Sequence, residues 1–121
     1  MELSRVLSRA LRGNLEQRAL HPEDPSHFMA SELALDEALS ALLDSVPESL
    51  DSALLQDLLL HENVDIAGKS VLLLQELLEQ QESPPAVLNT RILSCLVQLL
   101  YRLEQQDAEV FLRILVPTTL F

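Results

Sequence analysis

Apolar residues recur along the chain at spacings of three and four, which is the pattern of amphipathic helices. The most apolar stretch runs from Leu58 to Leu78 and reads as the end of one helix, a short polar break and a second helix. Apolar side chains cover most of the circumference of that second helix: Ile66, Ala67, Val71, Leu73, Leu74, Leu77 and Leu78. Because a helix with so few polar positions needs partners on several sides, the stretch predicts a stacked helical repeat.

The amino-terminal part predicts a helix followed by a rigid connector. The first helix covers residues 2–20, with Gly13 as a point where it kinks or ends. Its apolar face is Leu3, Val6, Leu7, Ala10, Leu11 and Leu15. The segment 21–27, HPEDPSH, then contains two prolines that block helix continuation, so the chain is expected to turn there.

A second helix is predicted from Phe28 to near Pro47. Ser26 is expected to cap it, and Phe28 and Met29 are expected to press it onto the first helix. The buried stripe is expected to comprise Phe28, Leu33, Leu35, Leu39, Leu42, Leu43 and Val46.

Two more helices lie on either side of the polar break in the apolar stretch. One is expected over 49–61 with Ser49 as its cap, and Asn63 is expected to cap the next. A glycine inside so apolar a helix usually marks a close approach of another backbone, so Gly68 is expected to be such a point. The prolines in Ser83-Pro84-Pro85 end the helix.

The last part predicts a helix from Ala86 or Asn89 to Glu104 and a short one over 109–116 capped by Asp107. The expected buried face of the longer helix comprises Leu88, Ile92, Leu93, Leu96, Val97, Leu99 and Leu100.

The fold class that follows is all-α, a right-handed solenoid fragment of armadillo or HEAT-like helical repeats. Hydrophobic residues make up 48% of the chain and aromatic residues only 3%, a mixture that favours helix over sheet. At 121 residues the chain suits one domain, 1–121. We expect capping helices over 1–46, a repeat region over 49–104, and the start of a further repeat or a divergent tail over 107–121.

The formal charge of -11 is unevenly distributed. Half of the eight basic residues lie in the first helix, and between His21 and Thr90 the only basic residue is Lys69, against fourteen acidic ones. The negative electrostatic field of this segment repels nucleic acid and attracts basic peptides or proteins, so direct binding to DNA or RNA is disfavoured. The alternative is that the acidic residues only solvate the outer faces of helices.

Other kinds of chemistry find little support. The single cysteine, Cys95, lies in an apolar helical run and reads as a small core residue. The histidines match no metal-ligand spacing, and Gly13 and Gly68 alone cannot form a phosphate-binding loop. We therefore expect no enzyme activity, no cofactor and no metal. No apolar run reaches the length that a membrane span requires.

Three amino-terminal segments resemble the β-catenin-like protein 1 family. They are Asn14-Leu-Glu-Gln-Arg18, Pro22-Glu-Asp-Pro25 and the segment FMASELAL over 28–35, and their mutual spacing agrees with the family's order. Further along, the segment HENVDIA over 61–67 is similar to the start of that family's first armadillo repeat. The matching structural residues are Asn14, Arg18, Pro22, Pro25, Phe28, Ser31, Glu32, Asn63 and Gly68.

The resemblance implies a nuclear, spliceosome-associated scaffold that binds basic protein segments of splicing factors. The acidic middle of the chain agrees in sign, and the candidate peptide-binding residues are Asp57, Glu62, Asp65 and Glu76. The alternative is a structural helical domain that pairs with a second copy or docks onto a larger helical protein, because the segment 111–121 is unusually apolar.

Overall fold

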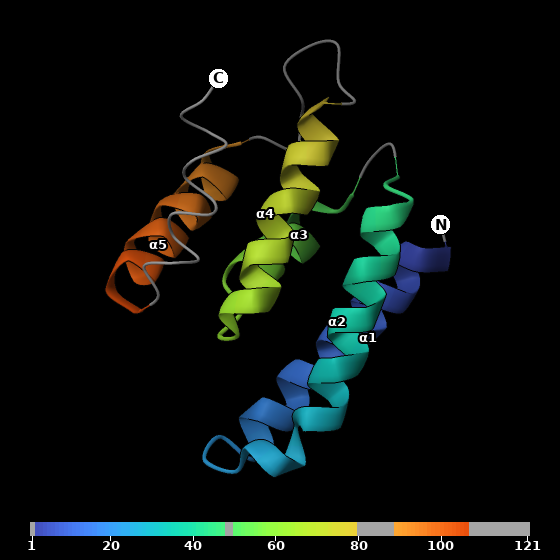
Figure 1. Ribbon diagram of the computed structural model, residues 1–121, viewed down its shortest axis with the longest axis vertical. Helices are drawn as coiled ribbons and strands as arrows, with labels where there is room; N and C mark the ends of the chain where they lie inside the picture. The colour runs from blue at the N-terminus through green and yellow to red at the C-terminus, as the bar shows by residue number, and fades with distance from the viewer. Residues whose placement is uncertain (1, 48–49, 80–88, 107–121) are drawn as a thin grey trace. The chain divides into compact units, whose positions relative to one another are not determined.

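The computed structural model describes residues 2–47, 50–79 and 89–106. Every regular element in these ranges is helical (Figure 1), and none is a strand. In chain order the elements are α1 (Glu2–Leu20), the 3-10 turn η1 (Pro25–His27), α2 (Met29–Asp44), α3 (Ser52–Leu59), α4 (Val64–Glu79) and α5 (Thr90–Gln106). The all-α prediction is therefore confirmed. The predicted helix over 109–116, the prolines at 84–85 and Ser49 lie outside the described residues.

Contacts divide the chain into two compact units, residues 1–47 and residues 48–121. The boundary falls where the sequence separates the capping helices from the repeat region. The organisation as one domain stays a prediction.

The first unit is a pair of helices. α1 and α2 lie side by side and run in opposite directions (Figure 1). Their shared core contains Leu7, Leu11, Leu35, Leu39 and Leu42. α1 continues unbroken through Gly13, so the prediction that the helix ends there is wrong, and a Cβ added at Gly13 would meet no atom within 4 Å.

Several predictions about the start of α2 are wrong. Met29 is 66% exposed and Leu33 is 59% exposed, because α2 buries only the stripe that faces α1. Ser26 does not cap α2: it lies inside η1, and its hydroxyl donates to Asp24 Oδ1 at 2.6 Å. Phe28 takes the cap position without a side-chain hydrogen bond, and its ring is buried, as predicted.

In the second unit α3 packs against both α4 and α5. α3 begins at Ser52, where Asp51 accepts a hydrogen bond from the backbone N–H of Ala53 at 3.1 Å. Asp51 is therefore the cap of this helix, and the predicted start at residue 49 is wrong. The buried face of α3 is Leu54, Leu55, Leu58 and Leu59.

The wide apolar surface of α4 is buried, as its pattern predicts. The buried residues are Ile66, Ala67, Ser70, Val71, Leu73, Leu74 and Leu77, while Leu78 is half-buried. α5 buries a narrower stripe made of Ile92, Cys95, Leu99 and Leu103. The prediction that Leu93 and Val97 are buried is wrong, because both lie off this stripe and are exposed.

Candidate protein-binding surface

The four candidate acidic residues all lie at the surface of the second unit. Asp57 lies on α3, Glu62 in the connection to α4, and Asp65 and Glu76 on α4, and each is exposed. The unit as a whole, residues 48–121, contains eleven acidic and four basic residues, which gives a formal net charge of -7.

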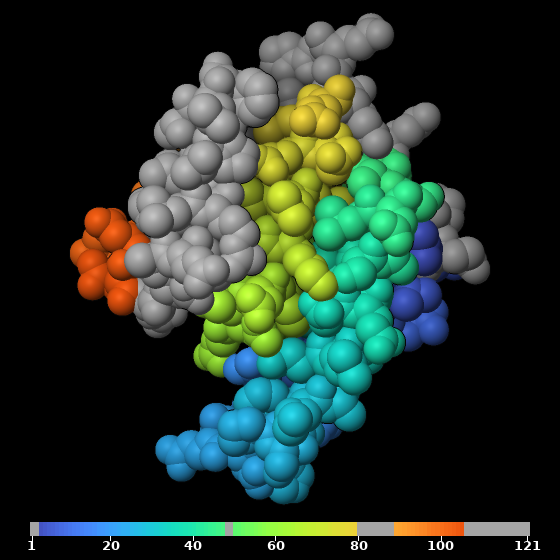
Figure 2. All heavy atoms as spheres, viewed as in Figure 1, coloured from blue at the N-terminus to red at the C-terminus, as the bar shows by residue number. Residues whose placement is uncertain are grey.

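Asp65 and Glu76 lie on one outer face of α4, together with Leu72 and Glu79. Their spacings of seven, eleven and fourteen residues from Asp65 correspond to nearly whole helical turns, so the four side chains form one stripe opposite the buried face. Figure 2 shows atoms of α4, in yellow-green to yellow, at the molecular surface. The rise of a helix places Asp65 and Glu76 about 16 Å apart along the axis. We call these four residues the α4 stripe.

Leu72 was not singled out by the sequence reasoning, although it is 52% exposed in the middle of the α4 stripe. Its position could have been found from the helical phase, because it falls opposite Ile66, Ser70 and Leu77. An apolar side chain between two carboxylates offers a contact for the aliphatic part of a lysine or arginine.

The charges of the other two acidic residues act on groups of α5. Burial raises the pKa of the Cys95 thiol, and the charge of Asp57 raises it further. Burial lowers the pKa of the Arg102 guanidinium, while the charge of Glu62 acts in the opposite direction. The structure therefore brings Asp65 and Glu76 together on α4 and leaves Asp57 and Glu62 outside the stripe. Cys95 is buried, which confirms its reading as a core residue.

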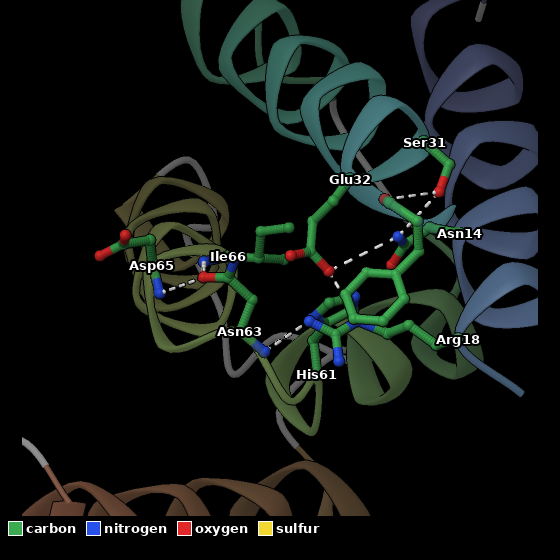
Figure 3. Close-up of polar contacts among 9 residues, drawn as sticks. Asn14, Arg18, Ser31, Glu32, His61, Asn63, Asp65 and Ile66 are labelled. Carbon is green, nitrogen blue, oxygen red and sulfur yellow. Dashed lines mark hydrogen bonds and ion pairs between the residues drawn. The ribbon is translucent and has the colours of Figure 1, made fainter. Parts of the chain in front are cut away.

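The amino-terminal end of α4 is held by a local polar motif, which Figure 3 shows. Asn63 Oδ1 accepts hydrogen bonds from the N–H groups of Asp65 at 2.9 Å and Ile66 at 3.4 Å, so the predicted cap is confirmed. The buried His61 accepts from the backbone N–H of Asn63 through Nδ1 at 2.9 Å. This motif orients the first turn of α4, where the carboxylate of Asp65 points away from Asn63 (Figure 3).

Five of the family-motif residues in the first unit contact one another, and Figure 3 labels four of them, Asn14, Arg18, Ser31 and Glu32. Arg18 Nε donates to Glu32 Oε1 at 2.6 Å, and the guanidinium lies 4.3 Å from the centre of the Phe28 ring. The fully buried Asn14 donates through Nδ2 to Ser31 Oγ at 3.1 Å and to Glu32 Oε1 at 3.5 Å. Ser31 Oγ in turn donates to the carbonyl of Phe28 at 3.0 Å. We call these residues the α1–α2 clamp.

The clamp is a structural feature of the helix pair. Its ion pair is mostly buried, with 18% of the Arg18 side chain and 16% of the Glu32 side chain exposed. Buried polar groups are tolerated only where they are hydrogen-bonded, so the clamp also fixes the register of α2 on α1. Pro22 lies in the turn before it and Pro25 begins η1. Gly68 is half-buried in α4, and its role as a close-packing point stays a prediction.

The histidine-containing turn is held by ring stacking and by a contact between His27 and Asp24. The rings of His21 and His27 stack with centroids 4.1 Å apart, and His27 Nδ1 lies 2.6 Å from Asp24 Oδ2. The hydroxyl of Ser26 and the ring of His27 hold the pKa of Asp24 below its usual value. Within residues 2–47, 50–79 and 89–106, no group of three or more His, Cys, Asp or Glu side chains is placed to hold a metal ion. None of the described helices is long and apolar enough to span a membrane.

Residues 2–116 match the family model described as "Catenin-beta-like, Arm-motif containing nuclear". No curated protein and no solved structure matches this chain. The matched range includes both the α1–α2 clamp and the α4 stripe.

Proposed function

The chain belongs to the catenin-beta-like, Arm-motif-containing nuclear family, and from this premise we propose that it is a non-enzymatic scaffold whose α4 stripe binds Lys- and Arg-rich segments of nuclear proteins. The family is one of helical protein-interaction domains. The resemblance of the 14–35 and 61–67 segments to the β-catenin-like protein 1 family supports splicing factors as the source of those segments.

The observation that carries the proposal is the placement of two exposed carboxylates, Asp65 and Glu76, on one face of α4. An extended peptide covers the distance of about 16 Å between them with about five residues. Two basic side chains at that spacing can each make a charge-assisted hydrogen bond, while Leu72 packs against an aliphatic stem. The net charge of the second unit attracts such a segment before contact. Binding of this segment requires only complementary charge and shape, and no covalent bond forms or breaks.

The test is a binding titration with a labelled peptide that carries two Lys-Arg pairs about five residues apart, followed by fluorescence anisotropy. Reversing the charges of the stripe with Asp65→Lys and Glu76→Lys is expected to weaken binding by about tenfold or more. Raising the salt concentration is expected to weaken binding of the unaltered chain, because exposed charges are screened.

The matched control reverses two exposed acidic residues on α2, Glu37→Lys and Asp44→Lys, which changes the net charge by the same amount. This control is expected to lose less than about threefold, through the general field alone. If both double variants lose the same affinity, or if the affinity does not change with salt concentration, the α4 stripe is not the binding site.

A specific observation supports a second candidate function, docking onto another helical protein. Leu93, Val97 and Tyr101 are exposed at intervals of four residues along the outer side of α5. A helical repeat would normally cover such a stripe with the next repeat. The sequence reasoning assigned this role to the segment 111–121, which lies outside the described residues.

Sedimentation velocity tests whether a second copy of the chain covers the exposed residues Leu93, Val97 and Tyr101 of α5. Self-association is expected to grow with concentration and to disappear in the Val97→Glu variant, which places a charge in the middle of the stripe. A monomer at every concentration would exclude a second copy, and the stripe would then be available only to a different helical protein.

A further inference from the structure

The outer side of α1, opposite the face that packs on α2, carries a row of arginines. Arg5, Arg9 and Arg12 are spaced by four and three residues, which places them next to one another along the helix. All three are exposed, and none forms an ion pair or hydrogen bond with another residue of the described chain. The ion pair between α1 and α2 uses Arg18 instead. The charges of the row are therefore available to a partner.

An apolar row runs beside the arginines. Val6 is 48% exposed and Leu20 is 62% exposed, and Gly13 lies midway between them at a spacing of seven residues. Because seven residues make nearly two whole turns, the three positions lie in line over about 21 Å of the helix. Arg9 is three residues from Val6 and four from Gly13, so the two rows border each other.

Gly13 has no function in the fold as the structure describes it. It lies inside α1, where glycine weakens a helix relative to alanine, and its φ is not positive. A Cβ in its place would meet no atom within 4 Å, so no neighbouring group of the described chain requires a glycine there. Between Val6 and Leu20 it leaves a gap on the outside of the helix. A side chain of a second helix can fill such a gap.

We propose that this side of α1 binds an amphipathic helix of a partner protein. Apolar residues of that helix pack along Val6, Gly13 and Leu20, and its Asp or Glu side chains pair with the arginines. Carboxylates spaced by three and four residues match the arginine row, because both rows then follow the same helical rise. We call the six residues of this surface the α1 outer face: Arg5, Val6, Arg9, Arg12, Gly13 and Leu20.

The surrounding charge favours a short acidic surface over a long polyanion. Arg5 and Arg12 are about 10 Å apart along the axis, and the row ends at the acidic Glu16. The first unit, residues 1–47, contains eight acidic and four basic residues, which gives a formal net charge of -4. RNA would extend past the arginines over this negative surface and be repelled. A helix with two or three carboxylates can end its charge where the row ends.

The α1 outer face does not depend on the α4 stripe, which has the opposite charge. The Asp65→Lys, Glu76→Lys variant is expected to lose binding of the basic peptide. It is expected to bind an acidic helix at least as tightly as the unaltered chain does, because it carries less negative charge. Failure of one proposal is therefore distinguishable from failure of the other.

The test uses the full chain and two fluorescein-labelled peptides, three repeats of LEAALEQ and three repeats of LQAALQQ, with fluorescence anisotropy as the readout. The Glu residues of the first peptide are spaced by four and three, as the arginines are. The Glu peptide is expected to bind about tenfold more tightly than the Gln peptide, or better. The general field of the chain predicts the opposite order, because a net charge of -11 repels an acidic peptide. Added salt is expected to weaken binding of the Glu peptide.

A matched pair of variants tests the arginine row. Arg9→Glu reverses the charge in the middle of the row, and the control Arg91→Glu reverses an exposed charge in the first turn of α5. Arg9→Glu is expected to weaken binding of the Glu peptide about tenfold or more, and the control less than about threefold.

A second pair tests the gap at Gly13. Gly13→Gln fills the gap and is expected to weaken binding of the Glu peptide about fivefold or more. The same variant is expected to raise the urea midpoint of the free protein, because glutamine is the better helix former. A loss of affinity together with a gain in stability cannot come from unfolding. The control Ala34→Gln, at an exposed position of α2, is expected to keep the affinity within about twofold.

NMR identifies the surface that the peptide contacts. The Glu peptide is expected to shift the amide resonances of Val6 and Gly13 in a saturable way. Shifts at Leu93 and Val97 with none at Gly13 would place the peptide on α5 and overturn the proposal. Equal binding of the two peptides, equal losses in Arg9→Glu and Arg91→Glu, or an unchanged affinity in Gly13→Gln would also overturn it.

Three other occupants are outcomes of the same experiment. An RNA of about twenty nucleotides, or vesicles of phosphatidylserine, could bind more tightly than the Glu peptide and lose that binding in Arg9→Glu. Either result would assign the α1 outer face to nucleic acid or to a membrane surface and overturn the proposal. A dimer of the free chain that dissociates in Arg9→Glu would assign the face to a second copy and overturn it as well.

Discussion

Arg18 on α1 and Arg102 on α5 are two arginines with buried nitrogens and opposite surroundings. Arg18 forms an ion pair with Glu32 at 2.6 Å and lies over the Phe28 ring, so its charge is paired within the α1–α2 unit. Arg102 has two buried nitrogens without an acceptor among the described residues, and the charge of Glu62 acts against the lowering of its pKa by burial.

The difference separates an arginine whose charge is paired inside the fold from one with two buried nitrogens that are unpaired. Breaking a buried pair leaves an uncompensated charge, so a paired arginine is costly to remove. The two buried, unpaired nitrogens of Arg102 already carry that cost, so their removal is expected to stabilise the fold. The same logic sets the α1–α2 clamp apart from the α4 stripe, where exposed carboxylates contribute little to folding.

The largest expected effect is on the clamp. Arg18→Met is expected to lower the free energy of unfolding by about 3 kcal/mol, because Glu32 loses its charged partner in a largely buried site. Urea unfolding followed by circular dichroism measures it. The control Arg12→Met, at an exposed position of α1, is expected to change stability by less than about 0.5 kcal/mol. Equal effects in the two variants would show that the clamp does not hold the helix pair.

Substituting Arg102 is expected to change the free energy of unfolding in the opposite direction to substituting Arg18. Arg102→Met keeps the long aliphatic stem and removes the unpaired N–H groups, so stability is expected to rise by about 1 to 2 kcal/mol. The same urea titration measures it. A loss of stability similar to that of Arg18→Met would mean that Arg102 has a structural partner, and the contrast between the two arginines would fail.

A smaller effect is expected at Asn63, whose side-chain oxygen accepts from the backbone N–H groups of Asp65 and Ile66. Asn63→Ala removes the acceptor that caps α4 and is expected to cost about 1 kcal/mol. Asn63→Asp keeps a side-chain oxygen at the helix terminus and is expected to retain most of the stability. A cost at Asn63 as large as that at Arg18 would contradict the view that the long-range clamp matters more than a single cap.

Much of the second unit follows from local pattern. The wide buried face of α4 is predicted by its apolar residues, and the Asn63 cap is predicted by its position before the helix. The incorrect caps have a local cause too. Asp51 and Ser49 are both good capping residues two positions apart, and η1 intervenes before α2, so spacing alone does not choose between candidates.

Burial at the edges of helices is less predictable. Leu33 and Val97 lie in apolar runs and are nevertheless exposed, because a helix buries only the face that its neighbour covers. The family resemblance selected Asn14, Arg18, Phe28, Ser31 and Glu32 as motif residues, but the contacts among them appear only when α2 packs on α1.

The sequence by itself determined the helical class, the acidic character of the middle segment and the family, because short-range spacing and composition carry that information. Only the tertiary structure decided which charges have partners. Arg18 is paired with a residue fourteen positions away, whereas Nε and Nη2 of Arg102 meet no acceptor in the described chain. Such pairings depend on how helices pack, and packing is set by the joint burial of distant residues, which no local pattern records.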